Sequence, residues 1–245
     1  MKTVRRVSVA ALLAVGMASS CAQQEEALIV SHSPAFVDGD CFADPSQNTQ
    51  LQRGVLDVAY GTAYTLPVVL TNNLGARPGT TSNTGVENGE LQLRDVDVTL
   101  TMEQAPDVLR AVAAQNGAFV EFSQTLASVS LQPGQETGVL VDVITDGASR
   151  ALRDAIQANL DAGARPIVTA EVVFHATRTG NSTGSLGVID ARAYTFPIQV
   201  CIGCLPVTCE TCPDAQCPPD AAFVGPCGNA QDSVLVPSVC EAPAS

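Results

Sequence analysis

The stretch DVDVTLTM, residues 95–102, alternates polar and apolar side chains at every position. Successive side chains of a β-strand point to opposite faces, so this period of two predicts a strand with one buried face. We expect Val96, Val98, Leu100 and Met102 on the core side, with the aspartates and threonines between them facing solvent. Such half-buried strands are typical of antiparallel sheets that cover a core on one side.

The same alternation recurs along much of the chain. Tyr64, Leu66, Val68 and Leu70 share one face of a predicted strand, in which Pro67 indicates an edge strand or a backbone edge without a hydrogen-bonding partner. Further strands are predicted at 138–145, 167–178 and 188–200, the last two as a long antiparallel hairpin.

One helix is predicted among these strands. Leu152, Ile156 and Leu160 recur every four residues, Ser149 can cap the start, and Gly163 can end the helix. The pattern as a whole predicts an all-β protein, an immunoglobulin-like antiparallel β-sandwich with one short crossover helix and a disulfide-rich irregular C-terminal cap. The chain has no tryptophan, which argues against the Cys-Trp-Cys core of a true immunoglobulin domain.

Residues 1–20 have the layout of a secretory signal, with a basic start, a short apolar run and small residues before Cys21. The apolar run is too short for a membrane-spanning helix of about 20 residues. The junction resembles the lipobox of bacterial lipoproteins, which implies lipidation of Cys21, and Ala22 after it implies an outer-membrane location. The alternative is an ordinary cleaved signal with an incidental cysteine.

The charge balance is acidic. Twelve Lys and Arg face 25 Asp and Glu, for a net charge of −13, and removal of residues 1–20 with their three basic residues changes it to −16. Such a chain repels nucleic acid and anionic lipid surfaces. The acidity could suit cationic or calcium-loaded partners, or simply keep an exported protein soluble.

These features predict four segments: a lipoprotein signal peptide over 1–20, a lipidated tether over 21–50, a β-sandwich domain over 51–200 and a cysteine-rich C-terminal segment over 201–245. Residues 72–90 form a long polar loop rich in Gly, Asn and Thr. Loops of this length are either functional or disordered, and we expect a mobile loop without a dedicated ligand.

Three stretches carry a family resemblance: DCFADPSQNTQLQRGVLDVAYGTAYTLPVVLTNNL at 40–74, ELQLRDVDVTL at 90–100 and YTFPIQVCIGCL at 194–205. Together they resemble a set of uncharacterised, myxobacterial-type secreted lipoproteins, over a span from Cys41 to about Leu205. The resemblance implies a surface lipoprotein without a known reaction.

Nine cysteines are present, and an even number remains if Cys21 carries lipid. Two C-x₂-C pairs lie only four residues apart, whereas zinc sites usually separate their ligand pairs by about 12–20 residues. We therefore expect disulfides, rather than a redox centre or a metal site in the 201–217 cluster. Because Cys41 is remote from the others, it must bridge to the 201–240 region in a fully oxidised chain. The expected disulfide cysteines are Cys41, Cys201, Cys204, Cys209, Cys212, Cys217, Cys227 and Cys240.

Catalytic patterns are sparse. GNSTG at 180–184 satisfies the G-x-S-x-G expression, but no histidine follows Ser182 and these residue types suit a hairpin loop. His175 lies on a strand beside Thr and Glu, as solvated histidines do. The pairs Asp38/Asp40 and Asp95/Asp97 could join a weak calcium site, but turn and solvent-facing roles are favoured.

The sequence thus predicts a non-catalytic surface lipoprotein without a cofactor or catalytic residues. Its expected role is structural, adhesive or partner-binding in the bacterial envelope, with the lipid on Cys21 as its membrane contact and no nucleic-acid partner. The alternatives are an envelope hydrolase using Ser182 or His175, and metal binding by the 201–217 cysteines.

Overall fold

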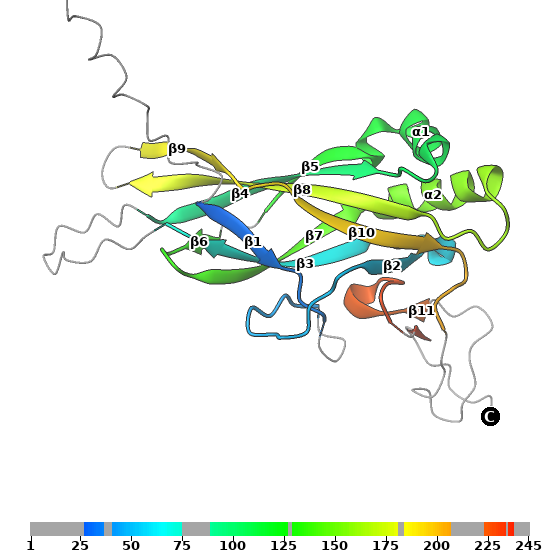
Figure 1. The fold of residues 1–245 in the computed structure, drawn as a ribbon, viewed down its shortest axis with the longest axis horizontal. Helices are drawn as coiled ribbons and strands as arrows, with labels where there is room; N and C mark the ends of the chain where they lie inside the picture. The colour runs from blue at the N-terminus through cyan, green and yellow to red at the C-terminus, as the bar shows by residue number, and fades with distance from the viewer. Residues whose placement is uncertain are drawn as a thin grey trace, which may run out of the picture.

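Two β-sheets enclose one hydrophobic core in the computed structural model, which describes residues 27–36, 41–74, 89–126, 129–180, 184–206, 223–233 and 235–237 (Figure 1). The largest fully buried side chains include Tyr64, Phe174 and Phe196. Strands dominate the described chain, so the expected all-β, sandwich-like fold is confirmed at this level.

The smaller sheet has three strands in the order β1-β3-β7, all antiparallel. These are β1 (Leu28–His32), β3 (Tyr64–Asn72) and β7 (Glu136–Ile144). Strand β3 is nearly completely buried. Tyr64, Leu66, Val68 and Leu70, predicted to share one face of this strand, all lie in the core.

The larger sheet has the order β2-β10-β8-β4-β5, with β6 beside β4 and β9 beside β8. Its strands are β2 (Gly54–Asp57), β4 (Leu91–Thr101), β5 (Glu121–Thr125), β6 (Ser130–Leu131), β8 (Ile167–Gly180), β9 (Gly184–Asp190) and β10 (Tyr194–Cys201). Val96, Val98, Leu100 and Met102 are buried, which confirms the alternation that the sequence predicts. All pairings are antiparallel except that of β2 with β10, which is parallel.

The hairpin predicted from 167–178 and 188–200 is present, but its second strand is divided. β9 ends at Asp190 and β10 begins at Tyr194, and both pair with β8. His175 lies opposite Asp190, and Val172 lies opposite Tyr194. The interruption after Asp190 therefore lets two short strands follow one long partner.

Pro67 lies in the middle strand of its sheet, at a position where β1 no longer pairs with that strand. The pairing of β1 with β3 extends from Asn72 only to Val69. At Pro67 the Ser33 hydroxyl donates to the carbonyl oxygen at 2.7 Å. The prediction that Pro67 lies in an edge strand is therefore wrong. The alternative is correct, because one backbone edge of the strand has no strand partner at Pro67.

The structure has two α-helices where the sequence predicted one; they gather at one end of the sandwich (Figure 1). The predicted helix is α2 (Asp146–Asn159), and it is capped by Thr145, whose side chain accepts from the Ala148 amide. Ser149 is buried inside α2 and does not cap it. The additional helix is α1 (Pro106–Gln115), which begins with proline at its first turn and buries Val108 and Val112.

The expected tether over 21–50 begins the domain rather than preceding it. Leu28–His32 form β1, and Leu28 is fully buried. Its apolar side chains gain more from the core than from solvent, and β3 offers an unpaired edge. Part of the expected 72–90 loop, residues 75–88, lies outside the described residues, as do residues 37–40.

The C-terminal segment folds back onto the beginning of the sandwich. Its regular elements are β11 (Phe223–Val224), which pairs with β12 (Val236–Pro237), and a short 3₁₀ helix, η5 (Pro226–Gly228). Gln231 lies opposite Leu56 of β2 in an isolated bridge, so β2 has a neighbour on each side. Figure 1 shows this segment beside β2.

Two disulfides lie in the described parts of the chain. One joins Cys41 to Cys227 at a sequence separation of 186, so the partner of Cys41 lies within the 201–240 region, as predicted. The other joins Cys201 to Cys204. Cys21, Cys209, Cys212, Cys217 and Cys240 lie outside the described residues. In the described ranges, no helix has the length and apolarity needed to span a bilayer.

The Cys41–Cys227 link is expected to dominate the covalent stabilisation. Its replacement by two alanines should lower the free energy of unfolding by about 5 kcal/mol, because the closed loop is long. The matched change at Cys201 and Cys204, three residues apart, should cost only about 2 kcal/mol. Denaturant unfolding without reductant measures both values. A larger loss for the Cys201/Cys204 pair would contradict the expectation.

Candidate functional site

The side chain of Gln231 replaces a missing strand at the open edge of β3. Its amide nitrogen donates to the Thr65 carbonyl at 2.9 Å, and its amide oxygen accepts from the Thr65 N–H at 2.8 Å. Gln231 is fully buried, and buried backbone groups are costly to leave unpaired. One carboxamide therefore satisfies both backbone groups of Thr65, as a neighbouring strand would.

Asp232 continues this closure with its carboxylate. Val55 donates its backbone N–H at 2.6 Å and Tyr64 its hydroxyl at 2.7 Å to the two carboxylate oxygens. The Asp232 backbone has a φ of 58°, the left-handed conformation that aspartate tolerates better than most residues. Burial raises the pKa of Asp232 to about 6, although these hydrogen bonds act to lower it.

Gly54 makes room for the Tyr64 hydroxyl. A Cβ atom at this position would lie 2.0 Å from the Tyr64 oxygen. The ring of Tyr64 is fully buried, so it could not move aside without disturbing the core. Glycine at the start of β2 is thus a condition for the Tyr64–Asp232 hydrogen bond.

A second carboxylate, Asp57, holds the loop that contains the first C-x₂-C pair. Its Oδ1 accepts the backbone N–H groups of Ala59 and Gly203 at 3.0 and 2.8 Å. Its Oδ2 accepts those of Cys204 and Leu205 at 2.7 and 3.1 Å. Asp57 is fully buried, and these four donors fill the acceptor positions of its two oxygens.

Within the described ranges, the one group of residues that could hold a metal ion lies at this same position. Potential ligand atoms of Asp57, Cys201 and Cys204 lie within 4.8 Å of one another. However, the two sulfurs are bonded to each other and the carboxylate already accepts four hydrogen bonds. The geometry therefore favours a structural loop anchor over a metal centre. Asp38 and Asp40 lie outside the described residues, and Asp95 lies 3.9 Å from Arg94.

His175 belongs to a polar row across the outer face of the larger sheet. Its Nδ1 lies 2.7 Å from Asp190, and its Nε2 lies 3.0 Å from Asp97. The hydroxyl of Ser123 donates to the other oxygen of Asp97. Burial alone would lower the pKa of His175, but the hydrogen bonds to Asp190 and Asp97 raise it above its ordinary value. The hydrogen bond from Ser123 is the main cause of the lowered pKa of Asp97.

This row differs from a hydrolase site. A general base needs a ring nitrogen directed at the nucleophile, whereas both nitrogens of His175 contact carboxylates. Within the row as described, the Ser123 hydroxyl donates to Asp97 rather than to His175. Ser182 lies outside the described residues. The row links β9, β8, β4 and β5, which suits a cross-strand structural role.

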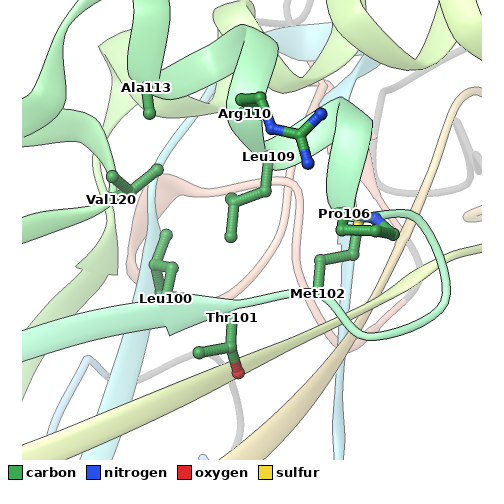
Figure 2. Close-up of a pocket in the computed structure, with 8 residues that line it drawn as sticks. All are labelled: Leu100, Thr101, Met102, Pro106, Leu109, Arg110, Ala113 and Val120. Carbon is green, nitrogen blue, oxygen red and sulfur yellow. The ribbon is translucent and has the colours of Figure 1, made fainter.

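A pocket of about 260 Å³ lies between α1 and the end of β4 (Figure 2). Arg110 is its one ionisable lining residue, and it forms an ion pair with Asp107 on the same helix. The other lining residues are Leu100, Thr101, Met102, Pro106, Leu109, Ala113 and Val120. The pocket therefore offers mainly apolar contact, with the Thr101 hydroxyl and the Arg110 guanidinium as its polar side-chain groups.

Comparisons with protein-family models, with curated proteins and with solved structures found no match. The closure by Gln231 and Asp232 was not anticipated from the sequence. The only signal in the sequence is the local run of Asn229, Gln231 and Asp232, polar residues in a segment otherwise read as irregular.

The raised pKa of Asp232 is expected to make the stability of the protein depend on pH. Its ordinary pKa is 3.8, so between about pH 4 and pH 6 the folded protein retains a proton that the unfolded chain has released. The contribution of protonated Asp232 to the free energy of unfolding is therefore complete below pH 4, and it is lost as the pH rises through 6. The loss amounts to about 3 kcal/mol by pH 7.

The test compares wild type with Asp232→Asn by denaturant unfolding from pH 3 to pH 7. The difference in unfolding free energy between the two proteins should change by about 3 kcal/mol over this range. Asp161→Asn, at an exposed position after α2, serves as the control and should follow wild type. Parallel profiles for wild type and Asp232→Asn would refute the assignment.

Proposed function

We propose that the chain is a non-catalytic, lipid-anchored module of the bacterial outer membrane with a structural, adhesive or partner-binding role. The observation that carries the proposal is the double closure of the domain. The Cys41–Cys227 disulfide and the buried contacts of 229–232 both fasten the end of the chain to its beginning. Disulfides persist in oxidising compartments, so this closure suits a protein outside the cytoplasm.

The strand order supports an immunoglobulin-like architecture with a disulfide-rich cap. Strands β1, β3 and β7 correspond to A, B and E of that architecture, and β10, β8, β4 and β5 correspond to G, F, C and C′. The crossover from β7 to β8 carries α2 and joins the two sheets. Domains of this architecture commonly serve recognition, an inference from fold alone.

The outer face of the larger sheet is the best-supported contact surface. Its side chains alternate with those of the core, and it presents hydroxyl and carboxylate groups from adjacent strands. Asp97, Glu121 and Asp190 are exposed on it, and the His175 row fixes several of its side chains. A rigid acidic face favours partners with basic surfaces.

If Cys21 carries the lipid anchor, the Cys21→Ser variant should change its location in the cell envelope. The wild-type chain should fractionate with outer membranes and incorporate radiolabelled palmitate, because a lipidated first residue anchors it. The variant should lose the label and appear in the soluble extracytoplasmic fraction. Membrane retention of the unlabelled variant would contradict a lipid anchor and point to retention by a protein contact.

Photo-crosslinking in intact envelopes tests the contact surface. A crosslinkable amino acid at Thr125 or Glu171, both exposed on the outer face, should give the same discrete adduct. The matched control is Gln157, exposed on α2, which should give none. Adducts from Gln157 alone would place the contact at the helical end instead. Adducts from none of the three positions would count against the partner-binding role.

A further inference from the structure

A hydroxyl, a carboxylate and a carboxamide converge where the C-terminal segment meets β3. The Thr65 hydroxyl donates to the Asp142 carboxylate at 2.6 Å, across the β3–β7 pairing. The amide nitrogen of Asn229 lies 2.9 Å from the same Thr65 oxygen. Thr65 is only 6% exposed, so its hydroxyl has little access to competing water.

These groups are held in register by contacts that leave little freedom. The backbone of Thr65 is fixed by Gln231 on both its N–H and its C=O. The Ala230 amide donates to Thr62 at 2.8 Å, and the disulfide at Cys227 holds the chain just before Asn229. Fixing reactants in this way removes much of the entropic barrier to a reaction between them.

The chemistry of the three groups is complementary. A threonine hydroxyl becomes a nucleophile when an adjacent base takes its proton, and the Thr65 proton already points at Asp142. A carboxamide is an acyl donor whose leaving group, once protonated, is ammonia. Asp142 is exposed to solvent, so it can exchange protons there.

We propose that Thr65 and Asn229 form an intramolecular ester. The Thr65 Oγ1 attacks the side-chain carbonyl carbon of Asn229, a C–O bond forms, and the bond between that carbon and Nδ2 breaks. The proton of the hydroxyl passes through Asp142 to Nδ2, which departs as ammonia. Nothing is oxidised or reduced, and no co-reactant is needed.

Asn229, rather than Gln231, is the acyl donor in this assignment. The carboxamide of Gln231 bonds to the backbone of Thr65 and not to its hydroxyl. Gln231 also lies 3.4 Å from the Asn229 amide nitrogen, through its oxygen. It is therefore a positioning residue that holds both reactants.

Mass spectrometry of the full chain tests the proposal after reduction and alkylation of its cysteines. The wild-type mass should be lower by about 17 Da, one ammonia, than the mass calculated for the processed sequence with its lipid and alkylated cysteines. Trypsin should then release residues 54–94 joined to residues 193–245, since Arg77 is followed by proline. Hydroxylamine, which cleaves esters, should separate the two peptides.

Three variants decide between an ester and a simple hydrogen-bonded contact. Thr65→Val removes the nucleophile, and Asn229→Asp removes the nitrogen that would leave as ammonia. Trypsin should therefore release two separate peptides from both variants. Asp142→Asn keeps the shape but removes the base, and should leave most chains unlinked. Thr65→Ser keeps the hydroxyl and should still link. Separate peptides at full mass in the wild type, or a mass loss that persists in Thr65→Val, would overturn the proposal.

Discussion

The fold depends on how the open edge of β3 is satisfied. A nearly fully buried strand needs a partner for every backbone N–H and C=O, yet β1 pairs with only one end of β3. The remainder is completed by side chains, from Ser33 at Pro67 and from Gln231 at Thr65. The C-terminal segment is consequently part of the sandwich, although it adds no regular strand to the smaller sheet.

Two carboxylates, one fully buried and one half-buried, serve the same purpose at neighbouring points. Asp57 collects four backbone N–H groups around the Cys201–Cys204 loop, and Asp232 collects one N–H and the Tyr64 hydroxyl. Among the residues that the structure describes, no basic side chain contributes to either set. Hydrogen bonds from neutral donors thus replace ion pairs, in a chain that has 12 Lys and Arg for 25 Asp and Glu.

Local patterns predicted the parts of the fold that have one buried face. The alternation in β4 and the four-residue repeat in α2 depend on near neighbours, so they can be seen in the sequence. Helix α1 was missed because Pro106 reads as a break and only Val108 and Val112 mark a buried face. The role of β1, the anchors at Asp57 and Asp232, and the His175 row could not be predicted, since their contacts join residues far apart in the chain. The Gln231–Thr65 contact spans 166 positions.

The covalent link between Cys41 and Cys227 also determines how the domain responds to mechanical load. Tension between an anchor before residue 27 and the C-terminal end would enter at β1 and peel it from β3. The pull would then reach Cys41 and pass directly to Cys227, bypassing the chain between them. Strands β2 to β10 lie outside this covalent path, and residues 229–232, which follow Cys227, couple the load to β2 and β3 only through hydrogen bonds. A domain built in this way can be stretched at its ends while the covalent path of the load leaves out the strands from β2 to β10.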